Sequence, residues 1–201
     1  IAMAADAPLE LAAEFALLAS GVAVTKAGTA TVSAAELLDL GAAELMSLDD
    51  ASDLVERWRA AECRIGFTNG CFDLLHPGHL KVLEEAKARC DRLIVGLNSD
   101  ASVARLKGDW RPVNSENSRA RLLSGLSAVD AVVLFEEDTP LALIEALKPD
   151  LLVKGGDYSV ETIIGAEVVT ESGGDVYIVP LAEGHSTTDM ISRAASPNAG
   201  G

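Results

Sequence analysis

The sequence predicts an α/β fold in which a five-stranded parallel sheet carries helices on both faces. From residue 63 onward, short apolar segments rich in Val, Ile and Leu alternate with segments of helical periodicity, which is the pattern of parallel βαβ units. Polar or glycine-rich motifs directly follow four of the apolar segments. Because parallel strands end at the same edge of a sheet, we expect these motifs to converge on one ligand site.

The individual elements follow from the spacing of apolar residues. Strands are expected at residues 64–68, 91–97, 131–135, 150–154 and 175–179. Helices are expected at residues 79–90, 100–106, 117–126, 140–147 and 187–194. Upstream, residues 8–20 and 34–46 have helical composition, and a polar break at residues 47–52 precedes a short helix that runs through Trp58.

This pattern divides the chain into four parts. Residues 1–48 are expected to form a small helical and extended appendage, and residues 49–62 a linker with one short helix. Residues 63–195 form the α/β domain, and residues 196–201 a disordered tail. An appendage of about 50 residues is too short to bury a good core by itself.

The composition restricts the classes of function. A formal net charge of −15 argues against binding to nucleic acid, and a site for polyphosphate must be a local island of positive potential. No apolar stretch is long enough to span a membrane, and the first residues lack the basic start of a signal peptide. Cys63, Cys71 and Cys90 include no CxxC pair, so neither a disulfide framework nor a zinc site is expected, and the expected location is a reducing cytoplasm.

The segment from Asn69 to Asp73 is the first candidate for a phosphate-binding turn. It joins the first expected strand to a helix, and Gly70 permits a tight turn that exposes the amides of Asn69 and Cys71 to a triphosphate. A plain strand-to-helix turn explains the same residues. Cys71 is not expected to act as a nucleophile, because direct attack on phosphorus needs no covalent intermediate.

Two histidines stand three residues apart at the start of the next helix. Between them, Pro77 fixes the backbone angle of the helix start, and Gly78 removes the Cβ that would block a phosphate. His76 and His79 could then donate hydrogen bonds to phosphate oxygens as negative charge develops in the transition state. A metal site is the alternative, but no third strong ligand lies nearby in the sequence.

Charged residues around these motifs are further candidates. Asp73 could carry Mg²⁺ through water, bind a substrate hydroxyl, or cap the turn. The basic, turn-rich segment at residues 105–114 is typical of a mobile loop, from which Lys107 and Arg111 could close over phosphate. Arg119, on the helix that follows, could reach the same place. The alternative is a solvated loop whose charges offset neighbouring acids.

Polar motifs follow the later strands as well. Asn98 stands at the end of the second strand, and Gly155-Gly156-Asp157 after the fourth suggests close approach to a base or ribose, although it also fits an ordinary turn. After the fifth strand, a helix start offers free N–H groups for phosphate or ribose oxygens, and helix capping alone would explain the same residues. This last motif contains Gly184, Ser186, Thr187 and Thr188.

Together these motifs resemble the nucleotidyltransferase superfamily whose hallmark is the HxGH motif. Within it, residues 63–195 are similar to the adenylyltransferase domain of a family of bifunctional enzymes, kinases and adenylyltransferases of heptose phosphates. The similar strings occur in order at residues 67–79, 96–100, 111–114, 137–140, 153–158 and 183–188. Residues 21–33 resemble the end of the ribokinase-like kinase domain of that family.

The resemblance implies a Rossmann-like fold, a reaction and a set of roles. In the implied reaction, AMP passes from ATP to D-glycero-β-D-manno-heptose 1-phosphate, which gives pyrophosphate and the ADP-heptose used in lipopolysaccharide biosynthesis. Mg²⁺ is expected to bind mainly through the ATP phosphates. The expected assembly is a homo-oligomer. The implied catalytic residues are His76, His79, Lys107 and Arg119. The implied nucleotide contacts are Thr68, Asn69, Gly70, Cys71, Phe72, Gly78, Gly155, Gly156, Asp157, Gly184, Ser186, Thr187 and Thr188, and the implied substrate contacts are Asp73, Asn98 and Arg111.

Two departures from the family pattern limit these expectations. The Gly-Ala-Gly-Asp motif of the kinase domain is absent, so a fragment without kinase activity is expected. Cytidylyltransferase relatives carry an Arg-Thr pair where this chain has Ala182 and Glu183, which weakens a reading as a CTP enzyme. A cytidylyltransferase for glycerol or another polyol phosphate remains an alternative, as does a non-catalytic nucleotide-binding module.

Overall fold

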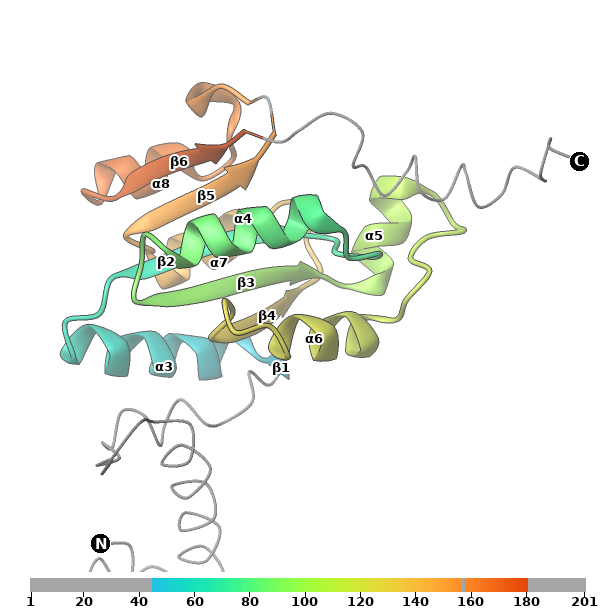
Figure 1. Ribbon diagram of the computed structural model, residues 1–201, viewed down its shortest axis with the longest axis horizontal. Helices are drawn as coiled ribbons and strands as arrows, with labels where there is room; N and C mark the ends of the chain where they lie inside the picture. Colours follow the sequence, from blue (N-terminus) through green and yellow to red (C-terminus); the bar gives the residue numbers. More distant parts are fainter. Residues whose placement is uncertain (1–44, 157, 181–201) are drawn as a thin grey trace, which may run out of the picture. The chain divides into compact units, whose positions relative to one another are not determined.

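A six-stranded, wholly parallel sheet forms the centre of the described structure. The computed structural model describes residues 45–156 and 158–180, and the strands of this part are ordered β1-β4-β3-β2-β5-β6 (Figure 1). Almost all of the predicted appendage, the helix predicted at residues 187–194 and the predicted tail lie outside the described residues.

All five predicted strands are confirmed, but the predicted number of strands is wrong by one. The strands are β1 Leu45–Met46, β2 Ile65–Gly70, β3 Arg92–Asn98, β4 Ala131–Phe135, β5 Leu151–Gly155 and β6 Asp175–Val179. The unpredicted strand β1 pairs with β4 at the edge of the sheet, in a segment expected to be helical. Two residues carry no alternation of apolar and polar side chains, so only the pairing with β4 identifies them as a strand.

Helices connect the strands, and most of them lie where the sequence places them. They are α3 Leu48–Ala60, α4 Pro77–Lys87, α5 Asp100–Lys107, α6 Glu116–Ser124, α7 Leu141–Leu147 and α8 Ala166–Glu171, with a 3-10 turn, η2, at Val160–Thr162. The short helix α8 and the turn η2 were not predicted. Among the described helices, none has the length and apolar character needed to cross a bilayer.

Helix α3 belongs to the folded domain, whereas the sequence suggested a linker ahead of residue 63. Ser47 caps its start, since the Ser47 side chain accepts a hydrogen bond from the backbone N–H of Asp50. Ala51, Val55 and Trp58 are buried in the same core cluster as the sheet. The folded unit therefore begins before the predicted boundary.

Two apolar cores cover the two faces of the sheet. Helices α3, α7 and α8 contribute to one core, and α4 and α6 contribute to the other. Figure 1 shows α4 in front of the strands and α7 and α8 behind them. Within β3, Ile94 faces the first core, and Leu93 and Val95 face the second, which is the alternation expected of a strand buried on both sides.

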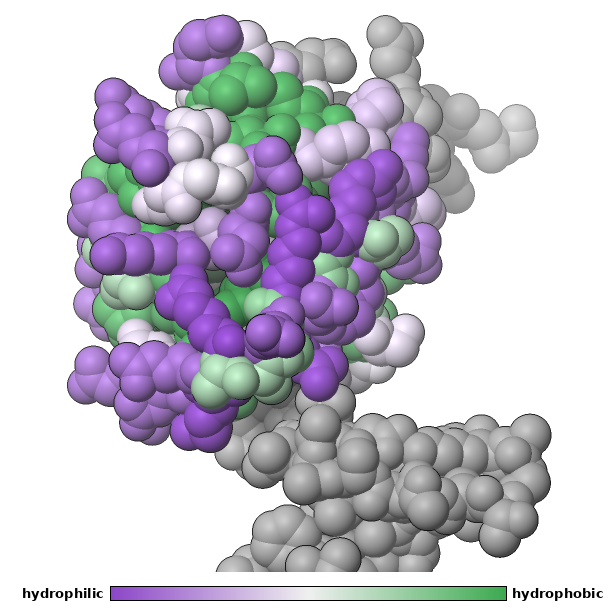
Figure 2. Space-filling model, turned by 90° about the vertical axis from the view of Figure 1, so that its left-hand side faces the viewer, coloured by the Kyte–Doolittle hydropathy of each residue, from purple (hydrophilic) through white to green (hydrophobic). Residues whose placement is uncertain are grey.

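Acidic side chains fix the amino ends of the strands. The carboxylates of Asp91, Asp130 and Asp150 accept backbone hydrogen bonds of 2.6–2.8 Å from the N–H groups of Arg64, Leu93 and Ile65, respectively. Figure 2 views the molecule from this end of the sheet, and hydrophilic residues cover most of it. These three carboxylates thus lie at the amino ends, away from the carboxyl ends where ligands bind in such sheets.

Candidate functional site

The carboxyl ends of three neighbouring strands meet around the turn that follows β2. On one side, the thiol of Cys71 donates a long hydrogen bond of 3.9 Å to Oδ1 of Asn98, at the end of β3. On the other side, the ammonium of Lys154, near the end of β5, donates to Oδ1 of Asn69. The structure therefore brings together polar motifs that lie up to 85 residues apart in the sequence.

The two predicted histidines stack against each other at the N-terminus of α4. His76 is the N-cap residue, and its Nδ1 accepts a hydrogen bond of 3.4 Å from the backbone N–H of His79. The ring centroids lie 3.8 Å apart at an interplanar angle of 23°, and the ring of Phe72 lies 5.1 Å from that of His79. Because Nδ1 of His76 accepts this hydrogen bond, a neutral His76 ring carries its proton on Nε2.

Both rings are shielded from water, and for His79 this shifts the pKa. His76 is 7% exposed, and His79 is half-buried. Burial, followed by the charge of His76, lowers the pKa of His79 to about 4, while a backbone hydrogen bond with Leu74 opposes the shift. At neutral pH the imidazole of His79 is therefore uncharged.

The predicted catalytic role of Arg119 requires a side chain that can reach a substrate, but the structure places this side chain inside the fold. Its side chain is fully buried, and Nη1 donates to the carbonyl oxygens of Cys71 and Asn98 at 2.6 and 2.8 Å. Nε donates to the carbonyl of Asn114 at 3.0 Å, and Nη2 pairs with Asp100 at 2.7 Å. Arg119 is thus a positioning residue that ties the turn after β2 to the end of β3.

Asp73 and Arg111 are paired with each other, although the sequence assigned both to the substrate. The carboxylate of Asp73 accepts hydrogen bonds from Nε of Arg111 and from the backbone N–H groups of Val113 and Asn114, the latter two at 2.7 and 3.0 Å. The Asp73 side chain is 0% exposed and that of Arg111 5%. With its oxygens filled in this way, Asp73 is not placed to bind a substrate hydroxyl or a hydrated Mg²⁺.

These contacts also correct the expectation of a mobile basic loop. Besides its backbone contacts to Asp73, Asn114 donates from Nδ2 to the backbone oxygen of Asp73 at 2.7 Å. Together with Arg119, Asp73 holds the end of the segment at residues 105–114 against the turn after β2. The cause is a buried ion pair between segments 38 residues apart, which no local pattern in the sequence reveals.

Lys107 remains an available cation at this edge of the sheet. It is exposed at the end of α5, and its charge lowers the pKa of the Cys71 thiol against the larger, raising effect of burial. The two nearby arginines, Arg111 and Arg119, are each paired with a carboxylate. Lys107, by contrast, has no ion-pair partner in the described part of the chain. The raised pKa of Cys71 keeps the thiol protonated, in agreement with the expectation that it is not a nucleophile.

Lys154 is the residue of this site that sequence reasoning missed. It is half-buried, and burial lowers its pKa to about 8. Its signal in the sequence was a lysine that interrupts an apolar strand directly before Gly155 and Gly156. Periodicity alone places such a lysine at a strand end and does not show that its head group turns toward Asn69.

Two glycines in the predicted turns occupy positions that a larger residue would not suit. A Cβ on Gly70 would meet the ring of Phe72 at 3.1 Å, and Gly156 has a φ of 129°, which L residues rarely adopt. Thr68 is buried in β2, and Gly78 lies in the first turn of α4. The remaining predicted nucleotide contacts, Asp157, Gly184, Ser186, Thr187 and Thr188, lie outside the described residues.

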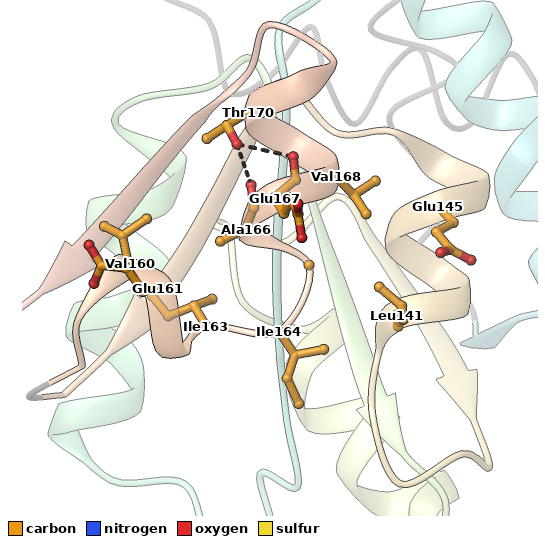
Figure 3. Close-up of a pocket in the computed structure, with 11 residues that line it drawn as sticks. Leu141, Glu145, Val160, Glu161, Ile163, Ile164, Ala166, Glu167, Val168 and Thr170 are labelled. Atoms are coloured by element: carbon orange, nitrogen blue, oxygen red, sulfur yellow. Dashed lines mark hydrogen bonds between the residues drawn. The ribbon is translucent and has the colours of Figure 1, made fainter.

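A separate hollow of about 690 Å³ lies beside α7, η2 and α8 (Figure 3). Its walls are apolar apart from Thr170 and three glutamates, Glu145, Glu161 and Glu167. Negative charge and the absence of a cation in its described lining make it unsuitable for phosphate. Neither here nor elsewhere in residues 45–156 and 158–180 is a group of three or more His, Cys, Asp or Glu side chains arranged to hold a metal ion.

A parallel sheet that presents a helix N-terminus, two imidazoles and two lysines at its carboxyl edge defines a class of α/β domain suited to binding phosphate groups. The cytidylyltransferase-like family model matches residues 67–192 of the chain. The chain belongs to this cytidylyltransferase-like family.

Curated relatives extend the similarity to nearly the whole chain. Bifunctional protein HldE of Hyphomonas neptunium is 57% identical over 200 residues, which cover 96% of this chain and 41% of that protein. Bifunctional protein HldE of Caulobacter vibrioides is 53% identical over 204 residues, covering 98% of this chain and 42% of that protein. The chain thus spans about two fifths of the length of these relatives.

Two solved structures are similar to the chain. The lipopolysaccharide core biosynthesis protein from Thermoplasma volcanium is 32% identical with a TM-score of 0.49, and the match covers 61% of this chain and 99% of that one. A pantoate-beta-alanine ligase from Francisella tularensis, complexed with beta-gamma ATP and beta-alanine, is 14% identical with a TM-score of 0.51 over 70% of this chain and 69% of that one. The second likeness concerns the fold alone.

Proposed function

We propose that this chain is a nucleotidyltransferase domain that transfers AMP from ATP to D-glycero-β-D-manno-heptose 1-phosphate. The observation that supports this most strongly is the stacked pair His76 and His79 at the N-terminus of α4. The same edge of the sheet carries Lys107 and Lys154, which have no carboxylate partner among the described residues. The identity of more than half of the residues with the two bifunctional relatives supports the choice of reaction. The kinase step is not proposed for this chain, because the Gly-Ala-Gly-Asp motif is absent.

The reaction is a direct displacement at the α-phosphorus. An oxygen of the sugar phosphate forms a bond to this phosphorus as the bond to the pyrophosphate oxygen breaks, so ADP-heptose and pyrophosphate leave without a covalent enzyme intermediate. Nε2–H of His76 and the neutral ring of His79 donate to phosphate oxygens on which charge increases, and the N-terminal dipole of α4 acts in the same direction. Lys107 contributes positive charge from the rim of the site.

Mg²⁺ would be carried by the nucleotide. Asp73 is committed to Arg111 and to two backbone N–H groups, so it is not a ready carboxylate ligand for the ion. Mg²⁺ commonly binds through substrate phosphates and water, where it would neutralise charge on the triphosphate.

ATP is favoured over CTP because Ala182 and Glu183 replace the Arg-Thr pair of the cytidylyltransferase relatives. A cytidylyltransferase acting on a polyol phosphate is the second candidate, supported by the family that the chain belongs to. Calorimetric titration with ATP and CTP separates the two, and tighter binding of CTP would overturn the choice of ATP. The three free cysteines support a reducing cytoplasm as the place where the enzyme works.

Pyrophosphate release from ATP and heptose 1-phosphate tests the role of the histidines. His79→Ala and His76→Asn should each lower the rate by about 10²–10³-fold, the typical cost of removing one transition-state donor. Asparagine is also a good N-cap residue, so His76→Asn preserves the start of α4 while it removes the imidazole. Glu84→Ala, at an exposed position on the same helix, is the matched control. Unchanged rates in both histidine variants would refute the proposed mechanism.

A further inference from the structure

We infer that Lys154 is a phosphate-binding residue of this site, which holds an oxyanion of a bound substrate from the β5 side of the turn after β2. This inference rests on the proposed function, because it assigns a ligand to the same edge of the sheet. Neither the family match nor the names of the relatives gives Lys154 a role.

Within residues 45–156 and 158–180, the surroundings of Lys154 supply no negative charge that compensates its ammonium. An ammonium has three N–H donors, and Oδ1 of Asn69 is the single acceptor in contact with it among residues 45–156 and 158–180. No carboxylate of the described residues lies within ion-pair distance of it. A lysine shielded from water is normally paired with an acid, so this arrangement is costly in the absence of an anion.

The location of Lys154 indicates which anion would compensate it. Its hydrogen bond to Asn69 places the ammonium at the end of β2, just before the turn that leads to His76. It interacts electrostatically with Cys71 in that turn, and so does Lys107. Strands β5 and β3 flank β2 on opposite sides, and α5 with Lys107 follows β3.

Two cations therefore approach the same turn from different elements, one from β5 and one from α5. A transfer between two phosphorylated substrates brings two phosphate groups to one place, and each cation can serve one of them. The ligand of Lys154 is accordingly a phosphate oxygen, which belongs either to the nucleotide or to the acceptor sugar phosphate. The lowered pKa of Lys154, about 8, agrees with an ammonium that lacks an anion and would be stabilised by one.

Calorimetric binding of two ligands to the full chain and to Lys154→Met tests the inference. The ligands are ATP and D-glycero-β-D-manno-heptose 1-phosphate, each titrated separately. The Kd for one of them should rise by about 10–100-fold in Lys154→Met, in line with the loss of a charge-assisted hydrogen bond, and the ligand that is affected identifies the source of the phosphate. Lys148→Met, at an exposed position after α7, is the matched control and should leave both Kd values unchanged.

Thermal unfolding separates this role from a structural one. Methionine removes an uncompensated, shielded charge, so Lys154→Met should unfold at the temperature of the wild type or above it. If Lys154→Met and Lys154→Gln both unfold at clearly lower temperatures, Lys154 has a structural role and the inference is overturned. Unchanged Kd values for both ligands in a stable variant overturn it as well.

The outcome for Lys154 can be read separately from that of the proposed function. If the wild type binds both ligands but releases no pyrophosphate, the proposed reaction fails, while the Kd values still decide the role of Lys154. If the wild type transfers AMP and Lys154→Met binds both ligands normally, only the inference fails. If the wild type binds neither ligand, both are overturned.

Discussion

Replacing Arg119 by methionine tests whether this residue acts on the substrate or on the fold. The guanidinium is fully buried and makes four hydrogen bonds, one of them in an ion pair with Asp100. Methionine fills much of the same volume but leaves the carbonyl oxygens of Cys71 and Asn98 without this donor. We therefore expect the free energy of unfolding to fall by about 4 kcal/mol, because each of these two shielded carbonyl oxygens loses its charged donor at a cost of about 2 kcal/mol.

Urea unfolding followed by circular dichroism measures this change. Arg121→Met is the matched control, because Arg121 is an exposed arginine on the same helix α6 and should change stability by less than about 0.5 kcal/mol. Arg119→Lys should be intermediate, since one ammonium cannot reach acceptors that the planar guanidinium bonds in several directions.

The opposite result would restore the catalytic role that the sequence suggested. If Arg119→Met unfolded at the same urea concentration as the wild type and yet lost about 100-fold in the rate of AMP transfer, the guanidinium would be acting on the substrate. The hydrogen bonds seen in the structure would then not describe the state that binds nucleotide.

Three further changes test the site. Asp73→Asn breaks the buried pair with Arg111 and should lower the free energy of unfolding by about 3 kcal/mol. The same substitution should speed tryptic cleavage after Lys107. An unchanged cleavage rate would show that Asp73 does not anchor the loop. His79 should titrate near pH 4 by NMR, and a midpoint near 6.5 would contradict its burial. Because the unfolded chain takes up this proton first, the free energy of unfolding should fall as the pH decreases from 6.5 to 4, by up to about 3 kcal/mol, and His79→Gln should remove that part of the slope. Cys71→Ser should keep the rate within about threefold, since a protonated thiol is not a nucleophile, and a loss of several hundredfold would indicate a covalent role.

The local pattern of the sequence predicted the main strands and helices of the fold. Continuous apolar segments such as residues 91–97 identify strands buried on both faces, because few other elements of that length are so apolar. Strand β1 and helix α8 were missed because each is short and is defined by its neighbours in space. Helix α3 was taken for part of a linker, since its buried residues Val55 and Trp58 are interspersed with charged ones and show their role only against the sheet.

The candidate site was predictable where its chemistry is local. His76 and His79 are brought together by a single helix turn, so their spacing in the sequence is enough to predict their contact. The roles of Asp73 and Arg111 depend on a contact across 38 residues, and that of Arg119 depends on four acceptors from different segments. Such buried cations look the same in the sequence as cations that face a substrate.

The sequence by itself determined the α/β class, the approximate positions of five of the six strands and the pair of imidazoles at a helix start, because these depend on neighbours within a few residues. Only the tertiary structure decided which charges are neutralised. Arg111 and Arg119 meet carboxylates within the fold, while Lys107 and Lys154 do not meet any among the described residues. The physical reason is that compensation of a charge depends on distance through space, which the packing of the sheet sets and the order of residues does not.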